Sequence, residues 1–341
     1  MKQEFHTNNR YPADLPMTPL VPIQLSADEP VIWCKLEFLN PSGSTKDRIA
    51  RYILGNAFDR GHLKPGSTVI EASSGSTSIA MALVCAQLGL RFIAVLPEGV
   101  SNERVLMIRA YGGDIHFTPK ESGIVGSIRE SERLAAEMGG FLPRQFSNPE
   151  NAEAHELGTA REIVEQIPGH LVNAVVSGVG TGGTLVGLMR GCGSARHVQR
   201  AFLARPVDLG AKREQECCSF SCRIPGVMEC ISGLFRESDY LDLTTIEVSD
   251  QDAIETTREL IRLGFPVGPS SGLNYHAALI AAQCVWPAKV VTVFPDRMER
   301  YFSTELFRPF LGEPSTALPR CAEFQTDRAA QAKDQHVPND R

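Results

Sequence analysis

Strand-like and helix-like segments alternate along most of the 341-residue chain. Short apolar runs such as 67–71 (STVIE), 91–96 (RFIAVL) and 289–294 (KVVTVF) have the length and composition of buried strands. The alternation predicts βαβ units and therefore an α/β fold built on largely parallel sheets. The other expected strands are 31–37, 114–117 and 174–177, and the expected helices are 77–88, 102–111, 127–138, 154–166, 185–190, 250–263 and 271–283.

The length of the chain fits two lobes better than one small core. A loop around Asn148 and Asn151 interrupts the alternation, so we place the division between two α/β lobes near residue 150. The segment 312–341 is polar and rich in Pro, Ala and charged residues, and we expect it to be a disordered tail.

Charge and hydropathy exclude two classes of partner. The net charge of −6 at pH 7 provides no broad basic field for nucleic acid. No apolar run has the length of a membrane span, and the polar N-terminal segment has no apolar signal core. We therefore expect a cytoplasmic protein that binds neither nucleic acid nor membrane.

Nine cysteines, an odd number without a secretion signal, indicate reduced thiols rather than disulfides. Four of them crowd together: Cys217, Cys218, Cys222 and Cys230. They lack paired C-x-x-C spacing, so we expect free thiols and no metal site. The alternative is that the cluster responds to oxidation or captures a metal.

Lys46 follows a loop of small residues, 41–45 (PSGST), at the expected start of a helix. An amine at this position lies near the positive end of the helix dipole. Desolvation there would lower its pKa and favour the neutral amine that a Schiff base requires. The alternative is a solvated lysine in a flexible loop.

Two further loops connect a strand to a helix. In 71–77 (EASSGST), backbone N–H groups at the helix start are suited to a carboxylate, and the alternative is an ordinary N-cap in which Ser and Thr serve for capping alone. In 178–184 (GVGTGGT), four glycines allow several N–H groups to converge on a phosphate. This loop lacks the lysine of a P-loop and the spacing of a dinucleotide fingerprint, and the alternative is a turn without a ligand.

These loops, in this order, resemble the cysteine synthase and cystathionine β-synthase family of pyridoxal-phosphate enzymes. The lysine loop of the family, N-P-x-G-S-x-K-D-R, corresponds to 40–48, its T-S-G-N-T-G loop to 73–78, and its G-T-G-G-T loop to 180–184. A Q-F-x-N-P segment at 145–149, a G-x-S-x-G turn at 268–272 and a P-D-x-x-E-R-Y-x-S-T block at 295–304 are also similar. The resemblance extends from Thr18 to about Phe307.

The resemblance implies pyridoxal-phosphate fold type II. It implies a larger cofactor-binding lobe, 1–46 with 151–311, and a smaller, mobile substrate lobe, 47–150. Lys46 is implied to form the internal aldimine and to act as the catalytic base. The implied ligands of the cofactor phosphate are Gly180, Thr181, Gly182, Gly183 and Thr184, those of its ring are Ser76 and Ser270, and those of the substrate carboxylate are Ser73, Ser74, Thr77 and Gln145.

The position of Ser270 carries an expectation about the reaction. A serine at the pyridine nitrogen shares a neutral hydrogen bond, so the ring is a weaker electron sink than it would be beside a carboxylate. We therefore expect β-elimination followed by addition of a nucleophile. The expected reaction is cysteine synthase-like: an O-activated serine and sulfide give cysteine through an aminoacrylate.

Two departures from the family pattern keep other reactions open. Ser76 stands where the family has Asn, and Ser78 where it has Gly, and this loop resembles that of cysteine desulfhydrases. The alternatives are a 2,3-diaminopropionate-type synthase with an amine nucleophile, a desulfhydrase that carries out β-elimination, and a degenerate regulatory homologue. For the enzyme, the resemblance implies a homodimer that binds a small amino acid and a small nucleophile.

Overall fold

The computed structural model describes residues 15–193, 200–207, 224, 227, 232–285 and 289–310. The chain divides into two compact units, Met1–Phe307 and Arg308–Arg341. The first unit contains two sheets, one of six strands and one of three.

The six-stranded sheet has the order β1-β2-β9-β6-β7-β8. Its strands are β1 (Leu20–Ile23), β2 (Ile32–Lys35), β6 (Ala174–Gly178), β7 (Arg200–Val207), β8 (Leu243–Ser249) and β9 (Val290–Val293). Neighbouring strands are parallel except for β1, which pairs with β2 in the antiparallel direction. Pro22 lies in β1, and its missing N–H donor is compatible with this edge position.

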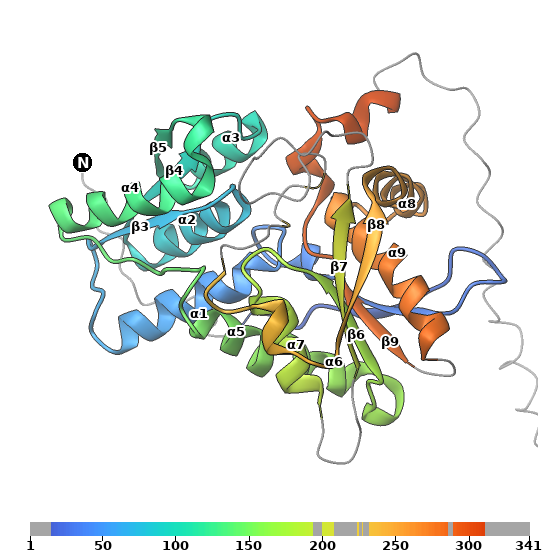
Figure 1. The fold of residues 1–341 in the computed structure, drawn as a ribbon. Helices are drawn as coiled ribbons and strands as arrows, with labels where there is room; N and C mark the ends of the chain where they lie inside the picture. The colour runs from blue at the N-terminus through green and yellow to red at the C-terminus, as the bar shows by residue number, and fades with distance from the viewer. Residues whose placement is uncertain are drawn as a thin grey trace, which may run out of the picture. The chain divides into compact units, whose positions relative to one another are not determined.

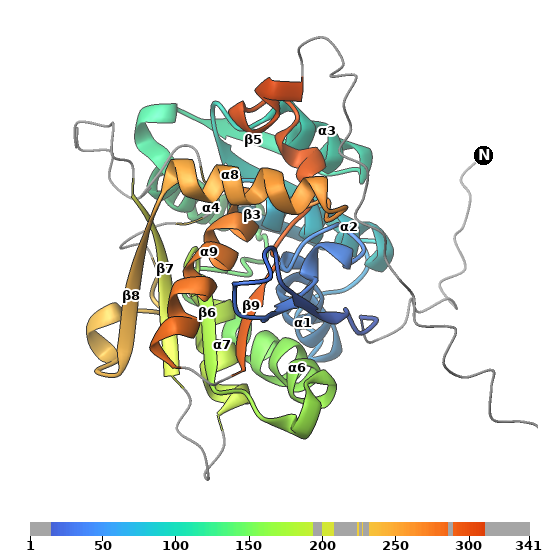
Figure 2. The same ribbon diagram turned by 90° about the vertical axis from the view of Figure 1, so that its right-hand side faces the viewer.

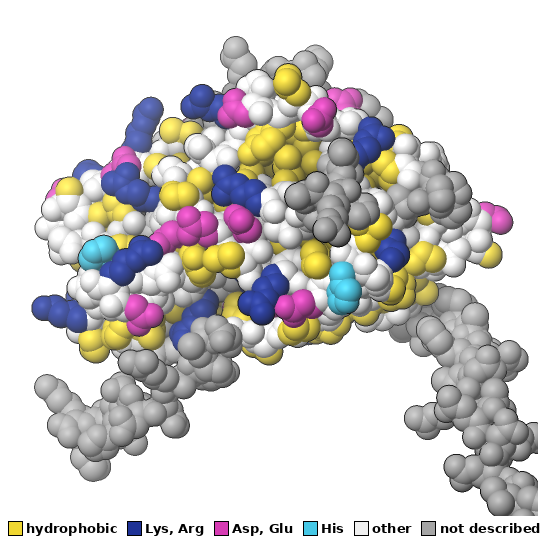
Figure 3. Space-filling view, turned by 90° about the horizontal axis from the view of Figure 1, so that it is seen from below, with side chains coloured by type: hydrophobic (Ala, Val, Ile, Leu, Met, Phe, Trp, Pro, Cys, Tyr) yellow, Lys and Arg dark blue, Asp and Glu magenta, His cyan; other side chains and the backbone are white. Residues whose placement is uncertain are grey.

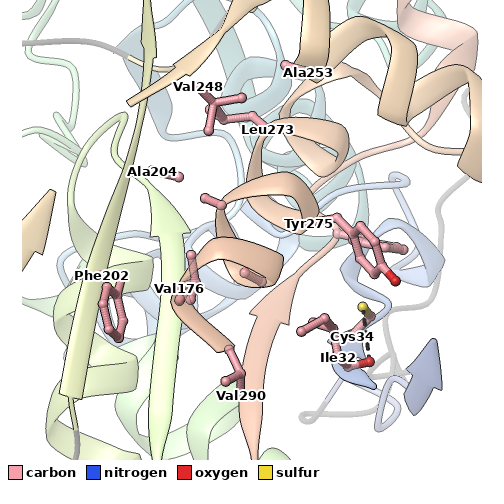
Figure 4. Packing of buried hydrophobic residues seen from close by; sticks show 14 of the residues in the cluster. Ile32, Cys34, Val176, Phe202, Ala204, Val248, Ala253, Leu273, Tyr275 and Val290 are labelled. Carbon is pink, nitrogen blue, oxygen red and sulfur yellow. Dashed lines mark hydrogen bonds between the residues drawn. The ribbon is translucent and has the colours of Figure 1, made fainter. Parts of the chain in front are cut away.

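Helices cover both faces of this sheet (Figures 1 and 2). Along β6, Val176 packs in a core with α9 (Pro269–Cys284), whereas Val175 packs in a core with α7 (Gly183–Cys192). Phe202 and Leu203 of β7 divide in the same way, because successive side chains of a strand point to opposite faces. Figure 4 shows the first core, where side chains of β2, β6, β7 and β9 meet α9.

The three-stranded sheet contains β3 (Thr68–Ala72), β4 (Arg91–Pro97) and β5 (Asp114–Thr118), all parallel. Helices α1 (Lys46–Asp59), α2 (Ser76–Leu88) and α3 (Asn102–Ala110) pack against one face. Helix α4 (Gly123–Met138) packs against the other face. Helix α1 also buries Ile49 and Ile53 against Ala154 of α5 (Glu150–Ala154). It therefore contacts both the three-stranded sheet and α5.

The expected α/β architecture with largely parallel sheets is confirmed. Three strands were not predicted: β1, β7 and β8. The helix expected at 154–166 begins earlier, at Glu150, and consists of α5, a π-helical turn (His155–Ala160) and α6 (Arg161–Gln166). The division into lobes and the mobility of 47–150 stay predictions. The tail 312–341 and the cluster of Cys217, Cys218, Cys222 and Cys230 lie outside the described residues.

Charges of both signs are interspersed on the face shown in Figure 3, with hydrophobic side chains among them. None of the helices that the described residues form has the length and apolarity that a membrane span requires.

Candidate active site

A cleft of about 900 Å³, including space open to solvent, lies where the loops of the two sheets meet. Ten of the twelve predicted site residues line it: Lys46, Ser74, Ser76, Thr77, Gln145, Gly180, Thr181, Gly182, Thr184 and Ser270. Segments that are far apart in the sequence therefore converge on one cavity. The other two predicted residues, Ser73 and Gly183, are buried and adjoin lining residues in the sequence but do not themselves line the cleft.

Lys46 is the first residue of α1. The loop before it is held by Asp47, whose carboxylate accepts hydrogen bonds from the Ser42 N–H at 2.9 Å and from the Ser42 hydroxyl. Burial lowers the pKa of the Lys46 amine below its usual range, although the carboxylates of Asp296 and Glu37 act in the opposite direction. The structure therefore favours the neutral amine at this position.

The loop 73–77 presents the start of α2 to the cleft. Its N-cap is Gly75, at φ +133°, so no side chain caps the helix. The hydroxyl of Ser73 lies 2.6 Å from that of Ser78 and accepts a hydrogen bond from the Gly75 N–H, so Ser73 supports the loop from behind. The interpretation of this loop as a Ser/Thr-capped helix start is therefore wrong. Thr77 faces the cleft and donates to Gln145 Oε1 at 2.6 Å.

The loop 178–184 presents the start of α7. Gly182, its N-cap, has φ +84°, a conformation that favours glycine. A Cβ at Gly183 would lie 1.8 Å from Asn151 Oδ1, so only glycine permits this close approach. Asn151 in turn donates to Thr181 Oγ1 at 2.9 Å and to the carbonyl of Gln145 at 2.7 Å. The Asn151 side chain thus connects the 178–184 loop to the 145–149 segment.

His155 lies beneath this loop and contacts Thr184. Its Nε2 is 3.2 Å from Thr184 Oγ1, and its Nδ1 is 2.9 Å from Thr159 Oγ1. Burial lowers the pKa of His155 to about 3. The imidazole is therefore neutral at physiological pH and can orient the Thr184 hydroxyl without adding charge to the site.

Ser270 reaches the cleft from the first turn of α9. Gly268 and Gly272, two residues before and after Ser270, allow the backbone to pack closely against neighbouring elements. A Cβ at Gly268 would lie 2.4 Å from Asp296 Oδ1, and one at Gly272 would lie 2.1 Å from the carbonyl of Ala253 in α8 (Asp250–Arg262). The G-x-S-x-G turn therefore places one hydroxyl in the cleft by bringing its backbone close to the neighbouring elements.

Besides α1, whose N-cap is Thr45, helices α2, α7 and α9 begin at the cleft, and these three have glycine at the N-cap: Gly75, Gly182 and Gly268. Glycine has no side chain to cap the first N–H groups. The surface helix α8 differs, because its N-cap Ser249 accepts a hydrogen bond from the Asp252 N–H at 3.0 Å. The three helix starts direct N–H groups and positive dipole ends into the cleft, and this arrangement favours anions.

Glu71 lies behind the same loops, at the end of β3. It is buried, and its two carboxylate oxygens accept hydrogen bonds from the N–H groups of Ala72 (3.1 Å) and Gln145 (3.2 Å). Burial raises the pKa of Glu71 to about 8, although these hydrogen bonds act in the opposite direction. The carboxyl group is therefore largely protonated at neutral pH.

The sequence assigned no role in the site to several residues that contribute to it: Arg104, Asn151, Asn274, Asp296 and Tyr301. Asp296 Oδ2 accepts hydrogen bonds from Tyr301 (2.7 Å) and Ser76 (3.4 Å). The block 295–304 carried the only available signal for Asp296 and Tyr301, because it matched the family without indicating their roles. Asn274 accepts from the Gly178 N–H at 2.7 Å and fixes the start of the 178–184 loop.

The residues present fit a phosphorylated cofactor that is bound through a lysine. The uncapped start of α7 and the hydroxyl of Thr184 can hold the phosphate, Lys46 can bind the carbonyl carbon, and Ser270 can meet a ring nitrogen. No group of three or more His, Cys, Asp or Glu side chains is arranged to bind a metal in the part of the chain that the structure describes. Fold and site together define the class of α/β enzymes that carry pyridoxal phosphate.

Comparison with known proteins identifies the family. The profile of the family described as "Pyridoxal-phosphate dependent enzyme" matches residues 14–296, and the chain belongs to this family. It is 36% identical over 301 residues to the cysteine synthase of Staphylococcus aureus (strain Mu50), covering 85% of this chain and 94% of that protein.

Solved structures agree. The crystal structure of the O-acetylserine-dependent cystathionine β-synthase from Helicobacter pylori has a TM-score of 0.77 and 34% identity, covering 86% of this chain and 96% of that one. The hydrogen sulfide-producing enzyme from Fusobacterium nucleatum has a TM-score of 0.76 and 34% identity, with 86% and 89% covered. The resemblance to the cysteine synthase family, pyridoxal phosphate as the cofactor and fold type II are confirmed.

Proposed function

We propose that this enzyme catalyses β-replacement on an O-activated L-serine, with sulfide as nucleophile and L-cysteine as product. The observation that carries the proposal is the position of Lys46, whose partly desolvated amine shares one cleft with the uncapped starts of α2, α7 and α9. Similarity to the cysteine synthase of S. aureus and to the O-acetylserine-dependent enzyme of H. pylori supports this choice of reaction.

Pyridoxal phosphate, when bound, supplies an electron-withdrawing ring that acidifies the α-proton of the amino acid. Lys46 Nζ accepts that proton, and burial, which lowers the pKa of this amine, favours the neutral form that a base requires. The C–H electron pair displaces the oxygen substituent from the β-carbon. Sulfide then forms the new C–S bond, and Lys46 returns the proton to the α-carbon, so each turnover yields cysteine and the released acid.

The substrate carboxylate binds, in this proposal, at the start of α2. Ser74 and Thr77 line the cleft there, and Thr77 is oriented by its hydrogen bond to Gln145. Ser73 contributes by holding the loop in place. The cofactor phosphate binds across 180–184, Ser76 lies near the ring, and Ser270 meets the ring nitrogen.

Production of hydrogen sulfide from cysteine is the second candidate, favoured by similarity to the F. nucleatum enzyme. Both reactions begin with removal of the same α-proton by Lys46, and they differ in whether a nucleophile or water completes the turnover. Assays with O-acetylserine plus sulfide, and with cysteine alone, distinguish the two. Faster formation of pyruvate and sulfide from cysteine than of cysteine from O-acetylserine would replace the first proposal by the second.

Replacement of the lysine tests the central assignment. We expect Lys46→Ala to lower kcat by about 10²–10⁴-fold, because the general base is lost, and to abolish the visible absorbance of lysine-bound cofactor. The far-UV circular dichroism spectrum should not change. Lys120→Ala is the matched control, since Lys120 is exposed and does not line the cleft. Full activity of Lys46→Ala would contradict the assignment.

We also propose that the enzyme works in the cytoplasm as a homodimer, on a small amino acid and a small nucleophile. The odd number of cysteines and the family resemblance support this. Light scattering on the purified protein tests it: a mass near twice that of the chain is expected, and a monomer would contradict the dimer.

A further inference from the structure

Arg104 is a buried cation that the proposed reaction does not use. It lies in the first turn of α3, lines the cleft and is only 6% exposed. Its Nη1 donates to the carbonyl of Ser74 at a long 3.3 Å. Its Nε–H has no hydrogen-bond partner, and no carboxylate pairs with its charge, among the residues that the structure describes.

The side chain is fixed in this position from two sides. A Cβ at Gly75 would lie 2.4 Å from Arg104 Cδ, so the alkyl part of the arginine runs directly along the 73–77 loop. The ring of Tyr301 lies against the guanidinium, with its centroid 5.1 Å from Cζ. These contacts hold a cation at the edge of the cleft but do not neutralise it, since a ring supplies only a weak counter-charge.

The other ionisable groups that line the described part of the cleft are Lys46 and Asp296. Burial lowers the pKa of Lys46 below its usual range, and the carboxylate of Asp296 acts in the opposite direction. Asp296 Oδ2 accepts a hydrogen bond from the Tyr301 hydroxyl at 2.7 Å, and Oδ1 has no hydrogen-bond partner among the described residues, so this carboxylate is not hydrogen-bonded to Arg104. Arg104 is left with its charge uncompensated, and burying such a charge is unfavourable unless a ligand pairs with it.

We propose that Arg104 is a second anion-binding group of the cleft, which selects substrates that carry a carboxylate or phosphate in addition to the amino-acid carboxylate. The planar guanidinium matches both anions, which it can bind through two parallel hydrogen bonds. The extra anion comes either from the leaving group of the donor or from the acid group of the nucleophile. The inference rests on the proposed β-replacement.

The donor is tested by comparing O-phosphoserine with O-acetylserine, each with sulfide. We expect Arg104→Gln to lower kcat/KM for O-phosphoserine about 10- to 100-fold more than for O-acetylserine, as expected for loss of a charge-assisted hydrogen bond. Arg104→Lys should restore part of the difference. Arg109→Gln, on the exposed side of the same helix, is the matched control and should leave the ratio unchanged.

The nucleophile is tested with O-acetylserine as donor, by comparing mercaptoacetate with 2-mercaptoethanol. A selective loss for mercaptoacetate in Arg104→Gln assigns the anion to the nucleophile, and a selective loss for O-phosphoserine assigns it to the donor. Equal losses for charged and neutral substrates in both experiments would overturn the inference, because Arg104 would then only hold the 73–77 loop. Melting temperature and cofactor binding of the variant show whether its fold is intact.

Failure of the proposed function gives a different result. The parent enzyme would then form no product from either donor with any nucleophile, and both proposals would be overturned together. If the parent is active and the Arg104 variants lose charged and neutral substrates alike, β-replacement stands and only the anion-binding role is rejected.

Discussion

Asn151 shows what the sequence could and could not indicate about single residues. Lys46 and the 180–184 loop were predictable because their chemistry depends on a short contiguous motif. Asn151 contacts Gln145 and Thr181, and the second of these lies 30 residues away. Arg104 and Asp296 likewise reach the cleft through tertiary packing. A single sequence does not specify such contacts, because they depend on how the elements pack together.

We expect Asn151→Ala to weaken the 178–184 loop and the 145–149 segment at once. The variant loses hydrogen bonds of 2.7 and 2.9 Å, each contributing about 0.5–1.5 kcal/mol, so cofactor affinity in a fluorescence titration should fall about tenfold. The KM for the amino acid should rise as well. Asn148→Ala is the control: it also loses two local hydrogen bonds, but neither of them reaches the 178–184 loop. Equal effects of the two variants on cofactor affinity would show that Asn151 has only a structural role.

At the scale of elements, the sequence predicted most helices and buried strands, because their periods are local. Strand β7 was missed, and so were the edge strands β1 and β8. Pro22 obscures β1, and half-exposed threonines interrupt the apolar pattern of β8. The π-helical turn His155–Ala160 has no recognisable sequence pattern. Helix α7, which packs against it, does have one. Gly183, Gly187 and Gly191 recur at intervals of four along α7 and form the face that meets α5 and this turn.

We expect Gly187→Ala to destabilise the protein by about 1–3 kcal/mol, since an added Cβ would lie 2.4 Å from His155 Cβ and 2.7 Å from the carbonyl of Ala152. Displacement of His155 should also weaken cofactor binding through Thr184. Gly55→Ala in α1 is the matched control. A Cβ there meets nothing within 4 Å, so a gain of about 0.5–1 kcal/mol is expected. Denaturant unfolding measures both, and a neutral Gly187→Ala would contradict the close packing of α7.

For the whole molecule, three buried groups set opposing dependences of stability on pH. The pKa of His155 is about 3, against an ordinary 6.5, so its contribution is lost as the pH falls from 6.5 to 3. Burial acts to raise the pKa of Glu37, but the Arg48 guanidinium outweighs it and lowers this pKa to about 2. The contribution of Glu37 to stability is therefore lost as the pH falls below 4.5. The pKa of Glu71 is about 8, so stability falls as the pH rises from 4.5 to 8.

We therefore expect the contribution of Glu71 to the unfolding free energy to decline as the pH rises from about 4.5 to 8, while the contributions of His155 and Glu37 are fully present above about pH 6.5. Urea unfolding at a series of pH values measures it. Glu71→Gln should remove the decline on the alkaline side while costing some stability at every pH, since an amide offers one acceptor to the two N–H groups that Glu71 serves. An alkaline decline that persists in this variant would assign it to another group.

The order of the six-stranded sheet also has a consequence for biosynthesis. Strand β9, near the end of the chain, lies between β2, near its beginning, and β6. While the chain is being synthesised, β2 and β6 are therefore made before β9, the strand that pairs with both, and each exposes an unpaired edge until β9 is added. The three-stranded sheet is continuous in sequence and can assemble as soon as it leaves the ribosome. The sheet that supplies the 178–184 loop closes only after residue 293 has been added, so the cofactor site is completed among the last steps of folding.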